Sequence, residues 1–255
     1  EAREYGILKL DKGGRISGFK EKPRSAPDLT WLEYIHTGSS APSFLASMGV
    51  YLFDADILIK VLKTNDIDFG REVIPNSIGK FRSLGYVFDD YWKDLGGIRS
   101  FYDANMELAQ HKPYLGFFYR GCIFTRPRFL PSAIIRRSTI KDSVITEGCV
   151  IKDAVIKDSI IGLRNIIGRG CRITRTVVIG ADYYDTAADK APIKIGIGDN
   201  TIIDKAIVDK NARIGRNVII RNTKKLKTFD GDNYFIRDGI VIIPKNSIIK
   251  DGTKI

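Results

Sequence analysis

An aliphatic residue that recurs every five or six positions through the second half of the chain constrains the fold more than any other feature. This period is typical of a parallel β-helix, in which three short strands form a triangular coil and the aliphatic side chain points inward. Single coils cannot bury that face, so they stack. The repeat consists of Ile140, Ile145, Ile151, Ile156, Ile161, Ile167, Ile173, Val178, Ile197, Ile203, Val208, Ile214, Ile220, Ile243, Ile249 and Ile255.

Two interruptions of the repeat, 182–191 and 222–233, are predicted to be loops that leave the prism. The repeat alone leaves the function open, because hexapeptide β-helices serve as scaffolds, as oligomerisation surfaces or as acyltransferases. An acyltransferase needs a histidine base between coils. Both histidines, His36 and His111, precede the repeat, so this reaction is not expected here.

Before about residue 132, helix and strand signals alternate. Two strands, 5–10 and 15–20, flank the turn signal Asp11-Lys12-Gly13-Gly14 and predict a hairpin. The stretch 23–42 is rich in Pro, Ser and Gly and predicts a loop. Asp54 is a candidate helix N-cap. Spacing and apolar runs predict further strands over 46–53 and 84–88, and helices over 54–64, 71–80 and 98–110.

Composition and charge exclude several classes of protein. The 255 residues are 44% hydrophobic and 28% charged, which excludes disorder, collagen and coiled coil. No apolar run reaches membrane-spanning length, and the first residues do not resemble a signal peptide. The three cysteines, Cys122, Cys149 and Cys171, are widely spaced and favour a reducing compartment.

The net charge of +11 is compatible with nucleic acid, an anionic membrane or small anions. Zinc-finger, RNP-like and basic amphipathic patterns are all missing from the sequence, so neither nucleic acid nor a membrane is an expected partner. The densest basic run, 223–227, is predicted to be a solvated loop.

Three short polar segments carry candidate chemistry. Lys22 at a strand end suits a phosphate, and the neighbouring Glu21 can accept hydrogen bonds from sugar hydroxyls. Ser47 and Gly49 in an apolar strand indicate close approach of a ligand. Asp94 follows a strand end and can hold Mg²⁺. The plainer alternatives are solvated charges at a strand exit, ordinary packing, and a helix cap at Asp94.

The order of these segments resembles the nucleotide-sugar pyrophosphorylases, and within them the ADP-glucose pyrophosphorylase family (glucose-1-phosphate adenylyltransferases). GADYY and DKNARIG resemble the plant and cyanobacterial branch, and YFIRDGIV with FYDAN resembles the plant large subunit. The matching segments are LASMGVY (45–51), DFGREVIP (68–75), YWKDLGGIRSFYDAN (91–105), TRPRFLP (125–131), GADYYDT (180–186), IGIGDN (195–200), IVDKNARIG (207–215) and YFIRDGIV (234–241).

The resemblance implies a fold of two domains. It implies a partial nucleotidyltransferase domain with a Rossmann-like mixed α/β sheet over 1–112. A linker over 113–132 and a left-handed parallel β-helix over 133–255 follow. The family's glycine-rich GTRL-type loop and its first metal-binding aspartate are not found in this sequence. We therefore expect the chain by itself to be inactive.

The implied reaction converts ATP and glucose 1-phosphate to ADP-glucose and pyrophosphate, in starch or glycogen synthesis. Position by position, the resemblance makes Lys22 the ligand of the sugar phosphate and Glu21 the ligand of glucose hydroxyls. Ser47, Gly49 and Trp92 line the sugar pocket, and Asp94 binds Mg²⁺. Anionic effectors, 3-phosphoglycerate and phosphate, are assigned to Arg126, Arg128, Lys210 and Arg237.

The resemblance further implies a tetramer, or a hetero-oligomer with a small subunit. It implies a plastid location in a plant and a cytoplasmic one in a cyanobacterium. Lys93 stands where the family commonly has an acidic residue or arginine. Two alternatives stay open: a pyrophosphorylase for another base or sugar, and a non-catalytic fragment that regulates or assembles an oligomer.

Overall fold

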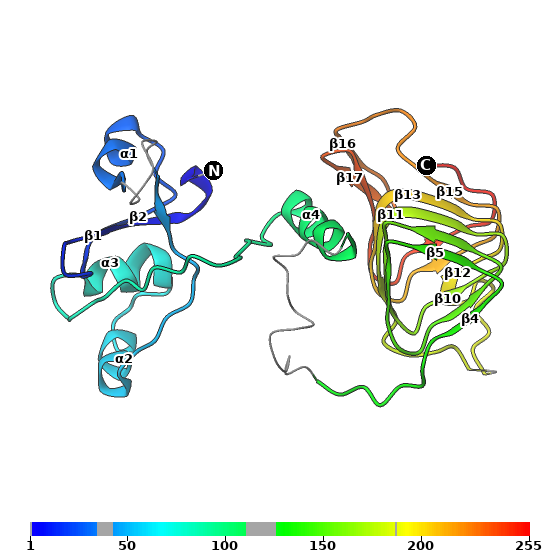
Figure 1. The fold of residues 1–255 in the computed structure, drawn as a ribbon, viewed down its shortest axis with the longest axis horizontal. Helices are drawn as coiled ribbons and strands as arrows, with labels where there is room; N and C mark the ends of the chain where they lie inside the picture. The colour runs from blue at the N-terminus through cyan, green and yellow to red at the C-terminus, as the bar shows by residue number, and fades with distance from the viewer. Residues whose placement is uncertain (1, 35–42, 111–125, 187) are drawn as a thin grey trace. The chain divides into compact units, whose positions relative to one another are not determined.

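Two compact units make up the computed structural model, Glu1–Trp92 and Lys93–Ile255, and each is described by itself (Figure 1). The second unit holds the repeat, as the period predicts. The structure describes residues 2–34, 43–110, 126–186 and 188–255.

Several sequence positions lie outside these ranges: His36, His111, Cys122 and most of the predicted linker 113–132. The other two cysteines, Cys149 and Cys171, are buried free thiols. Burial raises the pKa of both, that of Cys171 to about 11. Within the described ranges, no helix is long and apolar enough to cross a membrane.

An antiparallel sheet of order β2-β1-β3 organises the first unit. The hairpin of β1 (Gly6–Leu10) and β2 (Ile16–Glu21) confirms the prediction. Its turn is held by Asp11, whose Oδ1 accepts from the backbone N–H groups of Gly13 at 2.8 Å and Arg15 at 2.9 Å. The short strand β3 (Leu45–Ala46) pairs with the other edge of β1. The short 3₁₀ turn η1 (Ala2–Glu4) precedes β1.

Two helices of the first unit begin at side-chain caps. The predicted loop 23–42 is wrong in part, because α1 (Ala26–Leu32) starts where Ser25 Oγ accepts from Asp28 N at 3.2 Å. Proline in a first turn needs no N–H partner, so this Pro-rich segment can start a helix. Asp54 caps α2 (Ala55–Leu62), as predicted. The helix predicted over 71–80 is confirmed in part, because the π-helical turn η2 (Phe69–Val73) runs into the short helix α3 (Ile74–Ser77).

Two predicted strands are wrong for one reason, the lack of a pairing partner. The run 46–53 is a strand only in β3, and Leu52 is fully exposed. In 84–88, Leu84 makes an isolated bridge to Arg15, and Tyr86 is 90% exposed. A strand needs a neighbour for its backbone hydrogen bonds, which an apolar pattern does not provide.

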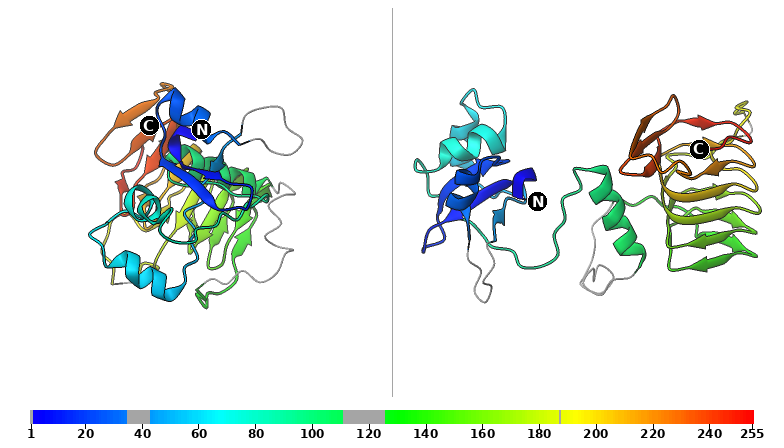
Figure 2. Two further views of the ribbon diagram at one scale, coloured as in Figure 1. Left: turned by 90° about the vertical axis from the view of Figure 1, so that its left-hand side faces the viewer. Right: turned by 90° about the horizontal axis from the view of Figure 1, so that it is seen from above.

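The second unit is a triangular prism of stacked coils, whose ladder is clearest in the right-hand view of Figure 2. One face is a parallel six-stranded sheet. Its strands are β4 (Ile134–Arg136), β7 (Val150–Lys152), β10 (Ile166–Ile167), β12 (Gly196–Ile197), β14 (Arg213–Ile214) and β19 (Ile248–Ile249).

The other two faces are joined by two long strands that bend around a corner, β11 (Arg172–Gly180) and β13 (Ile202–Val208). The first half of β11 pairs with β8 (Val155–Lys157), which pairs in turn with β5 (Thr139–Lys141), and the first half of β13 pairs with β15 (Ile219–Ile220). Their second halves pair with β9 (Ile160–Leu163) and β18 (Ile240–Ile243), and β9 also pairs with β6 (Val144–Ile145).

The register places the repeat residues in vertical ladders, which confirms the predicted β-helix. Ile151, Ile167 and Ile197 are consecutive rungs on one face, and all are at most 4% exposed. The ladders of the other faces run through Ile140, Ile156, Ile173, Ile203 and Ile220, and through Ile145, Ile161, Val178, Val208 and Ile243.

Corners of the coils need left-handed backbone, which Asp and Asn tolerate best among residues with a side chain. Asp142, Asp153, Asn200 and Asn211 accordingly have φ between 46° and 60°. Glycine is required at 162, where a Cβ would lie 2.0 Å from the carbonyl oxygen of Ile179.

The two interruptions differ in structure. The first, 182–191, holds no strand among its described residues, and Asp185 anchors it through a bidentate pair with Arg213 at 2.8 and 2.9 Å. The second is more ordered than predicted. It contains β16 (Thr228–Asp230), which forms an antiparallel hairpin with β17 (Phe235–Arg237), and β17 in turn pairs with β18.

Helix α4 (Ile98–Ala109) confirms the helix predicted over 98–110 and lies against the β-helix in the second unit. Tyr102 is 5% exposed and packs with Val177, Ile207 and Ile240. Its hydroxyl donates to the carbonyl of Arg175 at 2.6 Å. The compact second unit therefore begins before the predicted domain limit at 112.

The Tyr102 hydroxyl predicts an alkaline loss of stability. Burial raises its pKa to about 12, whereas the unfolded chain ionises near the ordinary value of 10.0. Between these values the unfolded state loses a proton that the folded state keeps, so stability falls as pH rises. We expect the denaturant midpoint of Tyr102→Phe to depend less on pH between pH 10 and 12 than that of the parent chain. At pH 7 the substitution should lower the free energy of unfolding by about 1 kcal/mol, the value of the lost hydrogen bond. The half-exposed Tyr183→Phe is the control. An unchanged alkaline slope in Tyr102→Phe would contradict the prediction.

Candidate functional site

The central strand β1 brings the predicted sugar-phosphate residues together around Tyr5 and Gly6. Glu21 pairs with Gly6 across the hairpin, and Lys22 N donates to the carbonyl of Tyr5 at 2.9 Å. On the opposite edge, Ser47 N donates to the carbonyl of Gly6 at 2.7 Å. Segments that are 25 residues apart in sequence (47 − 22) therefore meet at one end of the sheet.

The carboxylate of Glu21 lies between two glycines. A Cβ at Gly6 would be 2.6 Å from Glu21 Oε2, and a Cβ at Gly70 would be 3.0 Å from the same atom. Any side chain at position 6 would also meet the ring of Phe19 at 2.6 Å. Because neither glycine has a side chain, the carboxylate of Glu21 can occupy the space between them. Gly70 belongs to the DFGREVIP segment, so two of the resembling segments meet at Glu21.

The backbone turns sharply at Lys22 and at Gly49. Lys22 has φ +48° and an exposed side chain, so its ammonium projects from the strand end. Gly49 has φ +68°, and its N–H donates to Ser47 Oγ at 3.3 Å. Ser47 Oγ is also 3.3 Å from the hydroxyl of Tyr51. Ser47 therefore organises its own turn and keeps a hydroxyl beside the sheet edge.

Trp92 packs against Tyr5, next to the residues described above. The two rings meet edge to face with centroids 5.7 Å apart. Since the carbonyl of Tyr5 also accepts the N–H of Lys22, one residue connects the tryptophan and the lysine. The structure thus gathers Glu21, Lys22, Ser47, Gly49 and Trp92 within the first unit. Tyr5, Gly6 and Gly70 were not singled out by the sequence. The need for glycine at positions 6 and 70 becomes apparent only in the structure, where a Cβ at either position would come too close to the carboxylate of Glu21.

Asp94 belongs to the second unit and has an exposed carboxylate. The alternative of a helix cap at Asp94 is wrong, because the N-cap of α4 is Gly97, whose backbone N–H donates to Ser100 Oγ at 3.2 Å. The neighbouring Lys93 binds Glu107 Oε1 at 2.8 Å. Asp94 is therefore available for a role other than capping.

Metal binding by this chain would rest on few protein ligands. Across the described ranges, no cluster of three His, Cys, Asp or Glu side chains could hold a metal ion. Mg²⁺ keeps several waters and is usually bound by one or two carboxylates together with substrate phosphates. A single exposed carboxylate at Asp94 fits that chemistry, and does not fit a site that binds metal through protein ligands alone.

Among the predicted effector residues, Lys210 belongs to a cluster of three charged side chains. Its ammonium is 2.9 Å from Asp182 Oδ1, and Lys245 is 3.1 Å from Asp182 Oδ2. Hydrogen bonds from Lys210 and Lys245 hold the pKa of Asp182 well below its usual range. The sequence analysis missed Lys245. A signal was present, because the dipeptide Lys-Asn occurs at both 210–211 and 245–246, in adjacent coils linked by Asn211 and Asn246.

The structure does not bring Arg237 to Lys210. Arg237 pairs with Ile240 at the start of β18, whereas Lys210 follows Val208, the residue that pairs with Ile243 at the end of that strand. Arg237 is already engaged by Asp230 and lies over the Phe235 ring, 5.6 Å from its centroid.

Arg126 and Arg128 are the remaining predicted effector residues. They lie in irregular chain before the first coil, and the side chain of Arg128 is exposed. The structure provides no contact that joins either arginine to the Lys210 group. Their assignment to an effector stays a prediction.

Comparison with protein families matches two models to the chain. Residues 1–111 match the nucleotidyl transferase family, and residues 128–254 match the GLGC left-handed parallel beta-helix domain. The expected order of a nucleotidyltransferase domain followed by a left-handed β-helix is thereby confirmed. Helix α4 lies inside the nucleotidyl transferase match, although it packs against the β-helix. The chain thus matches the nucleotidyl transferase family over residues 1–111 and carries a GLGC-type left-handed parallel β-helix domain over residues 128–254.

Proposed function

We propose that this chain is part of a glucose-1-phosphate adenylyltransferase, and that it carries the sugar-phosphate and regulatory parts of that enzyme. One observation carries the proposal: a nucleotidyl transferase domain is joined to a GLGC β-helix domain in a single chain. The arrangement of Glu21, Lys22 and Ser47 around Gly6 supports it, because a carboxylate, an ammonium and a hydroxyl at one sheet end suit a phosphorylated sugar.

In the proposed reaction, an oxygen of the glucose 1-phosphate phosphate attacks the α-phosphorus of ATP, and pyrophosphate leaves. Lys22 holds the attacking phosphate by a charge-assisted contact. Glu21 accepts hydrogen bonds from sugar hydroxyls, and Ser47 and Trp92 orient the ring. This is catalysis by positioning, which needs no covalent enzyme intermediate. Mg²⁺, which Asp94 would help to hold, neutralises charge on the reacting phosphates when bound.

The regulatory part of the proposal concerns anionic effectors of the 3-phosphoglycerate and phosphate type. Lys210 and Lys245 share Asp182, so two cations face one carboxylate. An anion could displace Asp182 and take both ammoniums. Arg126, Arg128 and Arg237 remain proposed contributors, as do assembly into a tetramer or hetero-oligomer and a plastid or cyanobacterial cytoplasmic location.

Sugar-phosphate binding can be tested on the chain itself, because Trp92 borders the proposed site. The chain has two tryptophans, so Trp31→Phe leaves Trp92 as the only indole. We expect glucose 1-phosphate to change its fluorescence saturably, and glucose or inorganic phosphate to do so only at much higher concentration. A saturable response to mannose 1-phosphate or N-acetylglucosamine 1-phosphate, with none to glucose 1-phosphate, would favour another sugar-nucleotide pyrophosphorylase. No response to any sugar phosphate would favour a non-catalytic fragment.

Lys22→Ala should weaken glucose 1-phosphate binding at least ~10-fold, because a charge-assisted hydrogen bond is worth about 1.5–3 kcal/mol. The same loss should appear as a raised KM for glucose 1-phosphate in an active enzyme that contains this chain, with little change in the KM for ATP. Lys20→Ala is the matched control: Lys20 lies two residues earlier, on β2, and its exposed side chain lies 3.8 Å from Asp28. Equal affinity in Lys22→Ala and the parent would remove Lys22 from the site.

A further inference from the structure

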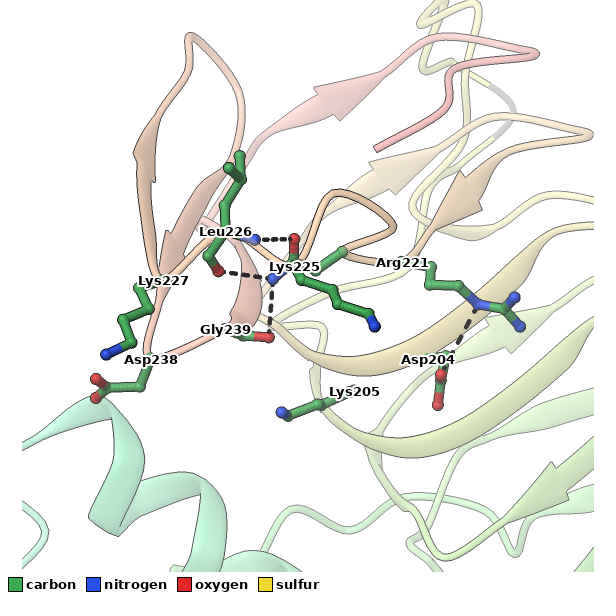
Figure 3. A pocket seen from close by; sticks show the side chains of 9 residues that line it. Asp204, Lys205, Arg221, Lys225, Leu226, Lys227, Asp238 and Gly239 are labelled. Atoms are coloured by element: carbon green, nitrogen blue, oxygen red, sulfur yellow. Dashed lines mark hydrogen bonds and ion pairs between the residues drawn. The ribbon is translucent and has the colours of Figure 1, made fainter.

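Helix α4 is fixed to the β-helix by two side-chain hydrogen bonds. The hydroxyl of Tyr102 donates to the carbonyl of Arg175 at 2.6 Å, and Arg99 Nη2 donates to the carbonyl of Asp238 at 2.6 Å. Asp238 lies in the turn between β17 and β18, at the rim of a cavity of about 230 Å³ (Figure 3). The position of α4 within the second unit is therefore set by residues of the prism.

The turn that receives Arg99 is supported by the loop before β16. Gly239 N donates to the carbonyl of Lys227 at 3.2 Å, so the loop is hydrogen-bonded to the turn. The basic run 223–227, predicted to be a solvated loop, contributes Lys225 and Lys227 to the wall of the cavity, and Lys227 points toward Asp238 (Figure 3). The N-terminal turn of α4 thus rests on an ordered part of the β-helix unit.

The segment 93–97, which carries Asp94, is tied to α4 at both of its ends. At its end, Gly97 N donates to Ser100 Oγ at 3.2 Å. At its start, the ammonium of Lys93 lies 2.8 Å from Glu107 Oε1. Glu107 is ten residues beyond Gly97 (107 − 97), which is about 15 Å along the helix axis. The ammonium of Lys93 is thereby drawn toward the third turn of the helix.

The carboxylate of Asp94 is placed differently from the ammonium beside it in sequence. A Cβ at Gly96 would lie 3.1 Å from Asp94 Oδ2, so the carboxylate lies close to the residues that precede the helix. Asp94 is exposed, whereas the side chains of Lys93 and Glu107 are only 30% and 19% exposed. Within the described part of the chain, Asp94 forms no ion pair. The neighbouring ammonium is therefore held by another carboxylate, and Asp94 stays open to a ligand.

We propose that Glu107 is a positioning residue for Asp94, because it binds the ammonium of Lys93 and so keeps it from competing with a divalent cation for the Asp94 carboxylate. This inference rests on the proposed role of Asp94 in Mg²⁺ binding. An ammonium within a few ångströms of a carboxylate cancels part of the attraction that the carboxylate exerts on a cation. A half-buried pair is screened less than an exposed one, which favours Glu107 as the partner of Lys93.

The test measures Mn²⁺ binding by the full chain with the Trp31→Phe substitution. Mn²⁺ takes the same oxygen ligands as Mg²⁺, and its unpaired electrons quench the fluorescence of a nearby indole. Trp92 is two residues before Asp94 (94 − 92) and reports such binding. We expect saturable quenching in the parent chain and its loss in Asp94→Asn.

The decisive comparison is a double-mutant cycle. Glu107→Gln should raise the Kd for Mn²⁺ at least ~5-fold, because the released ammonium can turn to Asp94. Lys93→Met alone, and Lys93→Met combined with Glu107→Gln, should both stay within about 2-fold of the parent, since no ammonium remains to compete. Asp103→Asn is the matched control: it removes a carboxylate from the same helix, in an exposed pair with Arg99, and should leave the Kd unchanged. Thermal unfolding followed by circular dichroism checks the fold of each variant.

Two results would overturn the proposal and leave the metal role of Asp94 intact. One is an unchanged Kd in Glu107→Gln. The other is equal weakening in Glu107→Gln and in the double variant, which would show that Glu107 acts through the fold and not through Lys93. Absence of saturable quenching, or quenching that persists in Asp94→Asn, would overturn the proposed metal role of Asp94 and this inference with it.

Discussion

Asp94→Asn is expected to lower kcat at least ~100-fold in an active enzyme that contains this chain, with little change in glucose 1-phosphate affinity. The substitution keeps the shape of the side chain and removes its charge. A metal ligand contributes most where charge develops during phosphoryl transfer, so its loss appears in kcat more than in sugar binding. Because Asp94 is exposed and α4 is capped at Gly97, the fold should be unaffected.

Steady-state kinetics at several Mg²⁺ concentrations provide the measurement, and thermal unfolding checks the fold. Asp103→Asn is a suitable control, because this carboxylate lies nine residues further on (103 − 94), on α4, in an exposed pair with Arg99 at 3.9 Å. It should keep kcat within about 2-fold, as expected for an exposed pair worth less than 1 kcal/mol. Near-parental kcat for Asp94→Asn at saturating Mg²⁺ would show that Asp94 does not support the reaction.

The largest expected effect on stability is that of Ile167→Ala. Ile167 is 1% exposed and lies in the ladder between Ile151 and Ile197. Truncation of a fully buried isoleucine removes transfer free energy and leaves a cavity, which typically costs about 2–5 kcal/mol. A stacked prism has no nearby flexible segment that could fill the gap, because each coil is hydrogen-bonded to the next. We expect the free energy of unfolding of the second unit to fall by that amount.

Ile166→Ala is the matched control, one residue earlier in the same strand. Ile166 is 39% exposed and points away from the prism interior, so its truncation should cost less than about 1 kcal/mol. Denaturant unfolding followed by circular dichroism compares the two. Similar losses for both variants would mean that the aliphatic ladder is not the main source of stability in this unit.

The β-helix was predictable because its determinants are local and repeated. Each coil meets only its neighbours, so a period in the sequence becomes a ladder in space, as in Ile156, Ile173 and Ile203. The hairpin of β1 and β2 and the Asp54 cap were equally local. The predicted strands at 46–53 and 84–88 failed because their outcome depends on a distant partner that no short window contains. Helix α1 was missed because its Pro and Ser residues also favour loops.

The candidate site likewise combines residues that short motifs predicted with features that only the tertiary structure shows. Motif order indicated Glu21, Lys22 and Ser47, because these residues lie in short segments with a recognisable sequence. Three further features depend on contacts between segments far apart in the chain. They are the accommodation of Glu21 by Gly6 and Gly70, the second lysine on Asp182, and the cavity lined by the basic loop.

The sequence by itself determined the β-helix, the order of the two domains and the chemical character of the residues proposed to bind the sugar phosphate. It could do so because these properties follow from a repeated period and from short motifs. Only the tertiary structure decided that Lys225 and Lys227 line a cavity and that Asp94 does not cap α4. The direction of a side chain depends on the backbone around it and on the neighbours that fill the remaining space. Close packing of distant segments sets both.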